Sequence, residues 1–265
     1  MFKFRFSLRG LLVAVFICAA MISLYLNTIA PRVRQGVAYR KISEDAARIG
    51  FEKDADLSTW QRFLCLFLKP EEARPVVEVT VTGNSPCPLS NFNEFTSLRK
   101  LVLTADGELE EGNEDFGPFL KLEELYIQNG NPKDISSMHC LSNLKLFSCY
   151  RKIEKGMGVL GTLPKLRVVD LLGSEFSQED LDGLSRSRSI EEVRIRFDSK
   201  VNSIDRFCEM KQLKSVTILQ NNVELSQLLS LSSLQKVELS RSTDRDEPVL
   251  AELRKRGVQV NVLDP

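Results

Sequence analysis

The chain has 265 residues, of which 43% are hydrophobic and 27% are charged. This is enough for one domain with a sizeable core and a small additional region. Its 36 basic and 36 acidic side chains cancel, which excludes the strongly basic composition of many nucleic-acid-binding proteins, so we expect no nucleic-acid partner.

The chain begins with a short basic segment, residues 1–10, and residues 11–30 then form an almost wholly apolar run. Twenty residues at about 1.5 Å of rise per residue cross a hydrocarbon core of about 30 Å, so we predict a single transmembrane helix in contact with the lipid bilayer. A cleaved signal peptide is the alternative, since small residues occur at Ala20 and Ala30, but the run is longer than a typical signal core. A short N-terminus before an early span favours a single-pass membrane protein whose later domain lies outside the cytoplasm.

Residues 31–70 are predicted to form two helices. The first covers residues 31–50, which carry a sparse apolar stripe at helical spacing. The second runs roughly over residues 57–68 and ends before Pro70. It has an aromatic stripe made of Trp60, Phe63, Leu64 and Phe67. We interpret this helical region as a cap that covers one end of the hydrophobic core that follows, with a ligand pocket as the alternative.

Residues 71–245 repeat one pattern, L-x-x-L-x-L with apolar substitutions, every 21 to 24 residues. A period in the twenties with this spacing is typical of a leucine-rich-repeat solenoid, an α/β fold. The fourth and sixth positions of each unit point to one side of a short strand, so parallel stacking of the strands builds a continuous core. The eight units are Val76/Val79/Val81, Leu98/Leu101/Leu103, Leu122/Leu125/Ile127, Leu144/Phe147/Cys149, Leu166/Val169/Leu171, Ile190/Val193/Ile195, Leu213/Val216/Ile218 and Leu234/Val237/Leu239.

The links between the strands must return along the convex side of the solenoid. The segment from Ser177 to Leu184 has a polar N-cap and an acidic first turn, so we expect a short helix there. The other links are rich in glycine and proline, and we expect them to be irregular. Residues 246–265 are predicted to form a C-terminal cap, with a helix from Pro248 to Arg256, a stop at Gly257 and a final strand.

The sequence resembles the membrane-anchored leucine-rich-repeat proteins of planctomycete bacteria. The resemblance rests on the basic tract Phe6-Ser7-Leu8-Arg9 that leads straight into the apolar run, and on a tryptophan in the cap region, Trp60, before the repeats. The sequence departs from the usual T-D-x-G-L link of these proteins, which survives only loosely in residues 177–184. The resemblance implies an interaction module whose partner is mostly unknown, and it supplies no catalytic residues.

The motifs that could carry catalytic or cofactor chemistry do not fit the repeat. Residues 156–161 match G-x-G-x-x-G, but Pro164 and the next strand leave no room for the helix that a dinucleotide site requires. We interpret these glycines as a flexible link. The only histidine, His139, has no plausible nucleophile partner. We therefore expect a protein that is not an enzyme and that holds no cofactor.

The cysteines are expected to be structural, and no metal site is predicted. A zinc set built from His139, Cys140, Cys149 and Cys208 fails because Cys149 belongs to the core pattern and no C-x-x-C pair exists. A full disulfide framework is not expected, because Cys18 lies in the apolar run and a buried free cysteine behaves as a small hydrophobic residue. A single disulfide among Cys65, Cys87, Cys140, Cys149 and Cys208 is the alternative that the sequence leaves open.

The candidate site is the centre of the concave face. Residues between the core positions point outward. Equivalent residues of successive strands form a column, in which neighbours lie about 4.8 Å apart. In one column Tyr150 is followed by Leu172 and then by Arg196. Charged residues of opposite sign alternate toward the ends of the columns, whereas the centre gathers apolar and aromatic side chains, as interfaces do. The predicted protein- or peptide-binding residues are Tyr126, Leu146, Tyr150, Val168 and Leu172. The alternative is a structural spacer or lateral-assembly element without a ligand.

Overall fold

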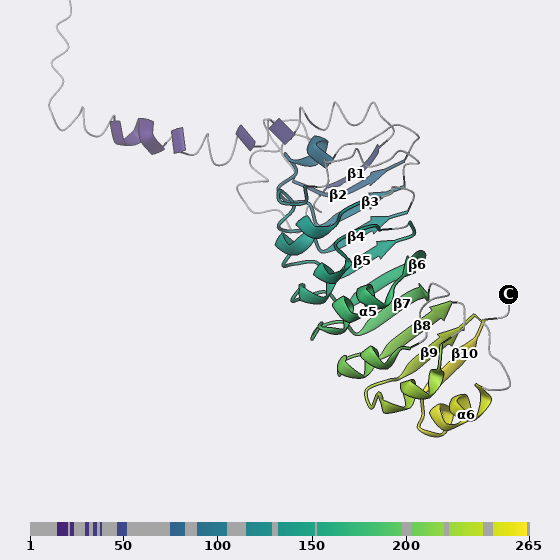
Figure 1. Cartoon of the computed structure of the whole chain (residues 1–265). Helices are drawn as coiled ribbons and strands as arrows, with labels where there is room; N and C mark the ends of the chain where they lie inside the picture. The colour runs from purple at the N-terminus through teal and green to yellow at the C-terminus, as the bar shows by residue number, and fades with distance from the viewer. Residues whose placement is uncertain are drawn as a thin grey trace, which may run out of the picture.

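The structure is a computed structural model. It describes residues 15–20, 22–23, 30–31, 34–35, 38, 47–51, 75–82, 89–104, 115–128, 132–151, 153–197, 203–219, 223–240 and 246–263. Ten strands form one sheet, in which each strand is hydrogen-bonded to its neighbours in chain order (Figure 1). The strands are β1 (Ala47–Phe51), β2 (Val76–Val81), β3 (Lys100–Leu103), β4 (Glu124–Ile127), β5 (Leu146–Cys149), β6 (Val168–Phe176), β7 (Glu192–Phe197), β8 (Ser215–Leu219), β9 (Lys236–Leu239) and β10 (Gln259–Val262).

Strands β2 to β9 are the eight predicted repeat strands, and they pair in parallel. Every first, fourth and sixth position of the pattern is buried, and the most exposed of them, Leu234, retains only 6% of its surface. All these side chains belong to one continuous hydrophobic cluster. The leucine-rich-repeat solenoid and its core positions are therefore confirmed.

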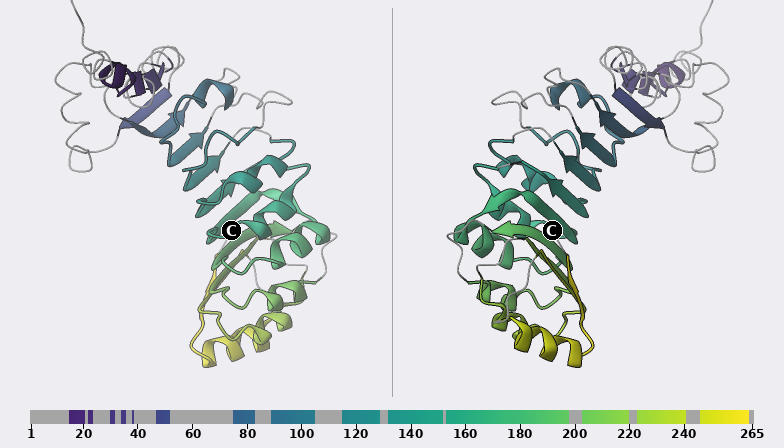
Figure 2. Two further views of the ribbon diagram at one scale, coloured as in Figure 1. Left: turned by 90° about the vertical axis from the view of Figure 1, so that its left-hand side faces the viewer. Right: turned by 90° about the vertical axis from the view of Figure 1, so that its right-hand side faces the viewer.

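The returning links carry short helices that pack on the other side of this core. Figure 2 shows the stack curving so that the strands line its inner side and the helices its outer side. Helix α5 begins as predicted, because the Ser177 side chain and Asp180 form a reciprocal capping box. Most of the other links contain a 3₁₀ turn and are less irregular than predicted, although the described part of the link between β3 and β4 contains no helix. The helices are η3 (Leu89–Phe92), η4 (Ser136–Cys140), η5 (Met157–Thr162), α5 (Gln178–Ser185), η6 (Asp205–Glu209), η7 (Leu225–Ser230) and α6 (Glu247–Lys255).

The G-x-G-x-x-G segment is a site of close packing rather than a flexible link. Gly156 has φ +89° and caps η5 in the left-handed region that favours glycine. A Cβ on Gly161 would lie 2.0 Å from the carbonyl oxygen of Gly183 in α5, and a Cβ on Gly183 would lie 2.6 Å from the Cα of Gly158. The glycines therefore let two helices of the convex side touch backbone to backbone.

The two ends of the sheet are closed differently. At the C-terminal end, α6 and the parallel strand β10 confirm the predicted cap, and Gly257 ends the helix with φ +84°. At the N-terminal end, the helix predicted over residues 31–50 is wrong in its last turn, because Ala47–Phe51 forms β1. This strand pairs antiparallel with β2 and so satisfies backbone groups that β2 would otherwise leave open at the sheet edge.

Most of the predicted N-terminal elements lie outside the described residues. The cap helix at residues 57–68 is among them, as are most of the predicted transmembrane residues 11–30. Residues 15–20 and 22–23 are helical. None of the helices that the structure describes has the length and apolar character needed to cross a bilayer. The membrane span stays a prediction.

Candidate functional site

The register of β4 to β7 arranges the outward side chains of the concave face as a grid. One row runs across the strands through Glu124, Leu146, Val168 and Glu192. The next row runs through Tyr126, Ser148, Asp170 and Arg194. Neighbours in a row are one strand spacing apart, about 4.8 Å. An apolar pair therefore lies between two glutamates, beside a row of polar and aromatic groups.

The predicted Tyr126 lies on β4 and Tyr150 directly follows β5, and a carboxylate accepts a hydrogen bond from each tyrosine. The Tyr126 hydroxyl donates to Glu124 Oε2 at 3.2 Å, and Lys100 Nζ lies 5.8 Å from the centre of its ring. The Tyr150 hydroxyl donates to Asp170 Oδ2 at 3.3 Å, yet 41% of this residue's surface is exposed. Partial burial raises the pKa of both phenols, with a further rise from the neighbouring carboxylates. Both hydroxyls therefore stay protonated and able to donate near neutral pH.

Asp170 lies at the centre of the grid and was not among the predicted site residues. It is only 6% exposed. Its partners are the Tyr150 hydroxyl, the backbone N–H of Leu172 at 3.4 Å and Arg194 Nη1 at 3.7 Å. Burial raises the pKa of its carboxyl group, and these three partners lower it in part. Asp170 thus anchors one side of the exposed tyrosine, and two of its three partners, Tyr150 and Arg194, lie outside β6.

Tyr126, Leu146, Tyr150 and Val168 follow the predicted alternation, but Leu172 does not hold its predicted place. Leu146 and Val168 are paired neighbours and half-buried. Leu172 was placed in a column with Arg196, and this is wrong, because the register of β6 shifts so that Glu175 pairs with Arg196. At the shift, a Cβ on Gly173 would lie 1.7 Å from the Tyr150 carbonyl oxygen. Gly173 therefore packs directly against the backbone of Tyr150, the residue that follows β5.

We use the name concave patch for the residues that this geometry brings together. They are Tyr126, Leu146, Tyr150, Val168, Asp170 and Leu172. The patch contains hydrogen-bond donors, an anionic group and apolar surface, which are the groups that a binding surface needs. Elsewhere, Cys140, Cys149 and Cys208 are free thiols, and the described part of the chain holds no group of three or more metal-ligating side chains.

Comparisons with known proteins support the fold. No family model matches the chain, and no curated protein matches it. Among solved structures, an internalin (inlF) of Listeria monocytogenes is similar, with 19% identity and a TM-score of 0.50 over 79% of this chain. The chain spans 62% of that internalin's length.

Two further structures are similar at lower scores. An internalin C2 of the same bacterium has 18% identity and a TM-score of 0.46, over 63% of this chain and 75% of its own. A leucine-rich-repeat protein of Leptospira interrogans has 13% identity and a TM-score of 0.34, over 69% of this chain and 57% of its own. At these identities the likeness concerns the fold, which is that of leucine-rich-repeat proteins.

Proposed function

We propose that this chain is a non-catalytic interaction module that holds a protein or peptide on the concave patch. The observation that carries the proposal is Tyr150, a large side chain with 41% of its surface exposed at the end of β5, whose first residue is the half-buried Leu146, paired with the half-buried Val168. Burying an apolar side chain of this size gains about 1.5–3 kcal/mol. A partner that covers the three residues would recover part of that free energy.

The charges on either side of the patch support a central binding position. Toward the N-terminal end, Lys100 pairs with Glu78 at 3.1 Å. Toward the C-terminal end, Glu238 accepts from Lys236 at 2.8 Å and from Thr217 at 3.0 Å. These groups already have partners within the protein. Because polar groups with partners gain little from a new contact, binding energy should concentrate on the aromatic and apolar residues between them.

The module is proposed to be tethered to a membrane by residues 11–30, with the repeats outside the cytoplasm. The support is the length of the apolar run in the sequence and the resemblance to the anchored planctomycete proteins. A charged residue near the middle of this run, such as Cys18→Arg, would oppose insertion by about 2.5–3.5 kcal/mol. Extraction of membranes with carbonate distinguishes an anchored protein from one that is not anchored, since a protein released by this treatment would not be anchored.

The second candidate function is lateral assembly. Strand β10 is the C-terminal strand of the sheet, and Val262 and Leu263 beside this edge are 37% and 45% exposed. An edge strand of this kind can pair with another strand. In that case the protein would associate with its own copies, and substitutions in the concave patch would leave the association unchanged.

The test is capture of a partner by the full chain in detergent, followed by affinity measurements on purified components. We expect Tyr126→Ala or Tyr150→Ala to weaken the captured partner by about tenfold, as central aromatic residues do, while the melting temperature barely moves. Lys255→Ala is the control, because its side chain is 81% exposed on α6. Equal losses in the control and the tyrosine variants would reject the concave patch as the binding site.

A further inference from the structure

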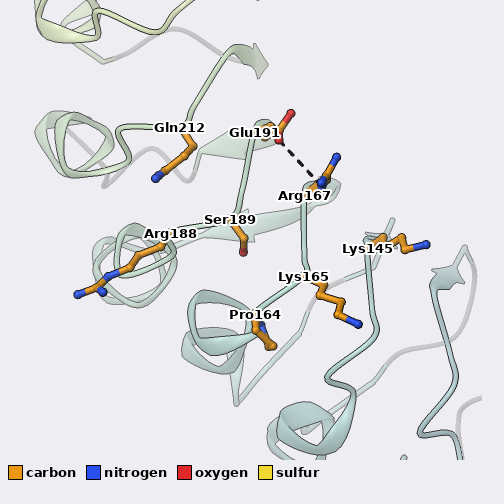
Figure 3. Close-up of a pocket in the computed structure, with 8 residues that line it drawn as sticks. All are labelled: Lys145, Pro164, Lys165, Arg167, Arg188, Ser189, Glu191 and Gln212. Atoms are coloured by element: carbon orange, nitrogen blue, oxygen red, sulfur yellow. Dashed lines mark ion pairs between the residues drawn. The ribbon is translucent and has the colours of Figure 1, made fainter.

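Outside the concave patch, the described surface has a cavity at one edge of the sheet and a strand edge at its C-terminal end. The cavity, of about 420 Å³, lies where the strands begin (Figure 3). The charged ends of Arg167 and Arg188 point away from each other on opposite sides of Ser189, and those of Lys145 and Lys165 point outward. The cationic groups of the cavity therefore do not converge on one ligand. The strand edge, in contrast, presents its backbone and apolar groups in one direction.

Strand β10 is the last strand of the sheet, and no described strand lies beyond it (Figure 1). The backbone N–H groups of Gln259 and Leu263 donate to carbonyl oxygens of the preceding repeat at 2.8 and 2.7 Å. Because backbone groups alternate in direction along a strand, the N–H and C=O groups of Val260 and Val262 point away from β9. The outer edge of β10 therefore presents hydrogen-bond donors and acceptors to a further strand.

The last layer of the hydrophobic core is also left partly exposed at this edge. Val260 and Val262 are paired with the two core residues of β9. Those residues, Val237 and Leu239, are fully buried. In contrast, Val260 is only half-buried, and Val262 is 37% exposed. The core columns that run through the repeats thus end in a layer that no described residues cover as fully as the earlier layers.

The outer edge of β10 carries none of the features that usually protect a strand edge. Such edges have charged residues, proline or a bulge, which prevent pairing with another strand. Residues 259–263 read Gln-Val-Asn-Val-Leu, without charge or proline. Strand β10 also pairs with β9 without a shift in register. This edge is therefore suited to pairing with a strand.

We propose that β10 pairs antiparallel with β10 of a second copy of this chain, around a two-fold axis at Asn261. The inference rests on lateral assembly, the second candidate function, and is independent of the concave patch. In this register Val260 lies opposite Val262 of the other copy, so two apolar pairs extend the core across the interface. Asn261 lies opposite its own equivalent. A two-fold interface brings identical residues together at its axis, and here that residue is uncharged.

A second copy suits this edge because each copy covers the last core layer of the other. The two-fold axis also makes α6 antiparallel to its equivalent. The acidic first turn of α6, with Glu247, then lies toward the basic last turn of the other copy, with Arg254 and Lys255, so no like-charged helix ends meet. The two sheets join into one, with both concave faces on the same side.

The experiment begins with the mass of the full chain in uncharged detergent, measured by size-exclusion chromatography with light scattering. We expect twice the 30.0 kDa of one chain. Val262→Lys should weaken the dimer by about tenfold, because its ammonium group would lie opposite the apolar Val260 of the other copy. Leu120→Lys is the matched control and should leave the dimer intact, since Leu120 is 55% exposed and precedes β4.

Disulfide cross-linking tests the register and does not depend on the folding of a lysine variant. In the proposed register the two Asn261 residues form a pair without direct backbone hydrogen bonds, and their Cα atoms lie about 4.5 Å apart. That distance allows a disulfide, so oxidised Asn261→Cys should form a covalent dimer. Gln259→Cys is the control, because its two copies would be displaced by about 13 Å along the strands. The parent chain gives the background from the native cysteines.

The proposal is overturned if the parent has the mass of one chain, or if Leu120→Lys weakens the dimer as much as Val262→Lys. It is also overturned if Asn261→Cys forms no more covalent dimer than Gln259→Cys, because the register would then be wrong. A monomeric chain that takes up an unrelated extended peptide on β10 would likewise reject the second copy. Tyr150→Ala should leave the dimer unchanged, so failure of the dimer and failure of the concave patch give different results.

Discussion

The convex and concave sides of the fourth repeat of the solenoid, which begins at Leu144, show opposite kinds of packing. On the convex side, η5 and α5 approach so closely that a Cβ on Gly161 would lie 2.0 Å from the Gly183 carbonyl oxygen. On the concave side, Tyr150 is 41% exposed. The repeat thus uses its links for dense packing and leaves the side chains of its strands accessible. Substitutions on the convex side should therefore change stability, and those on the concave side should change binding.

The largest expected effect comes from the core that both sides share. Leu171 lies between Asp170 and Leu172 in sequence but points inward and is fully buried. We expect Leu171→Ala to lower the free energy of unfolding by about 2–5 kcal/mol, because it removes buried methyl groups and leaves a cavity. Urea unfolding followed by circular dichroism measures the change. An unfolding free energy equal to that of the parent would contradict the assigned core position.

The next effect separates the two sides. Gly161→Ala should lower the free energy of unfolding by about 1–3 kcal/mol, as overpacking does, because the new methyl group meets the backbone of α5. Gly158→Ala is the matched control in the same 3₁₀ turn, since a Cβ there would lie 3.8 Å from Gly183 Cα, an ordinary contact. Both variants should leave the concave patch intact. Equal unfolding midpoints for the two variants would show that the close approach does not limit stability.

Much of the fold could be predicted from the sequence because each repeat has apolar residues at the same three positions. The period placed all eight core triplets, and the capping pattern at Ser177 placed α5. The 3₁₀ turns and the antiparallel strand β1 could not be predicted in this way. The turns are too short to show the periodicity of a longer helix. Strand β1 belongs to no repeat, so the only indication of it is that the edge of β2 needs a partner.

The candidate site was predicted less completely, because its details depend on contacts between strands. The outward positions of Tyr126, Leu146, Tyr150 and Val168 follow from the alternation along a strand. The register shift in β6 depends on Gly173 passing the Tyr150 carbonyl group. The alternation along β6 predicts that Asp170 is an exposed charge, yet it is only 6% exposed and contacts Tyr150 and Arg194. In its row Asp170 lies between Ser148 and Arg194, and this pattern does not predict burial.

The smallest expected effect concerns the ionisation of Asp170 in the concave patch. Burial raises the pKa of this carboxyl group in the folded protein above its value in the unfolded chain. The groups that act on it are Tyr150, Arg194, Glu192 and the backbone N–H of Leu172. For an acid with a raised pKa, the stabilising contribution is fully present below the unfolded value, about 3.9. It is lost as the pH rises through the folded value.

Asp170→Asn removes this titration and leaves the rest of the pH dependence in place, including that of Glu191 and Glu238, whose pKa values are lowered by bonds to lysines. The unfolding free energy of the variant minus that of the parent should therefore rise as the pH increases from acidic to neutral. Urea unfolding of both proteins from pH 3 to pH 7 measures the difference. A difference that falls with pH would mean that Arg194 stabilises the carboxylate by more than burial destabilises it. The Tyr150 hydroxyl would then donate to a carboxylate that its ion pair with Arg194 stabilises.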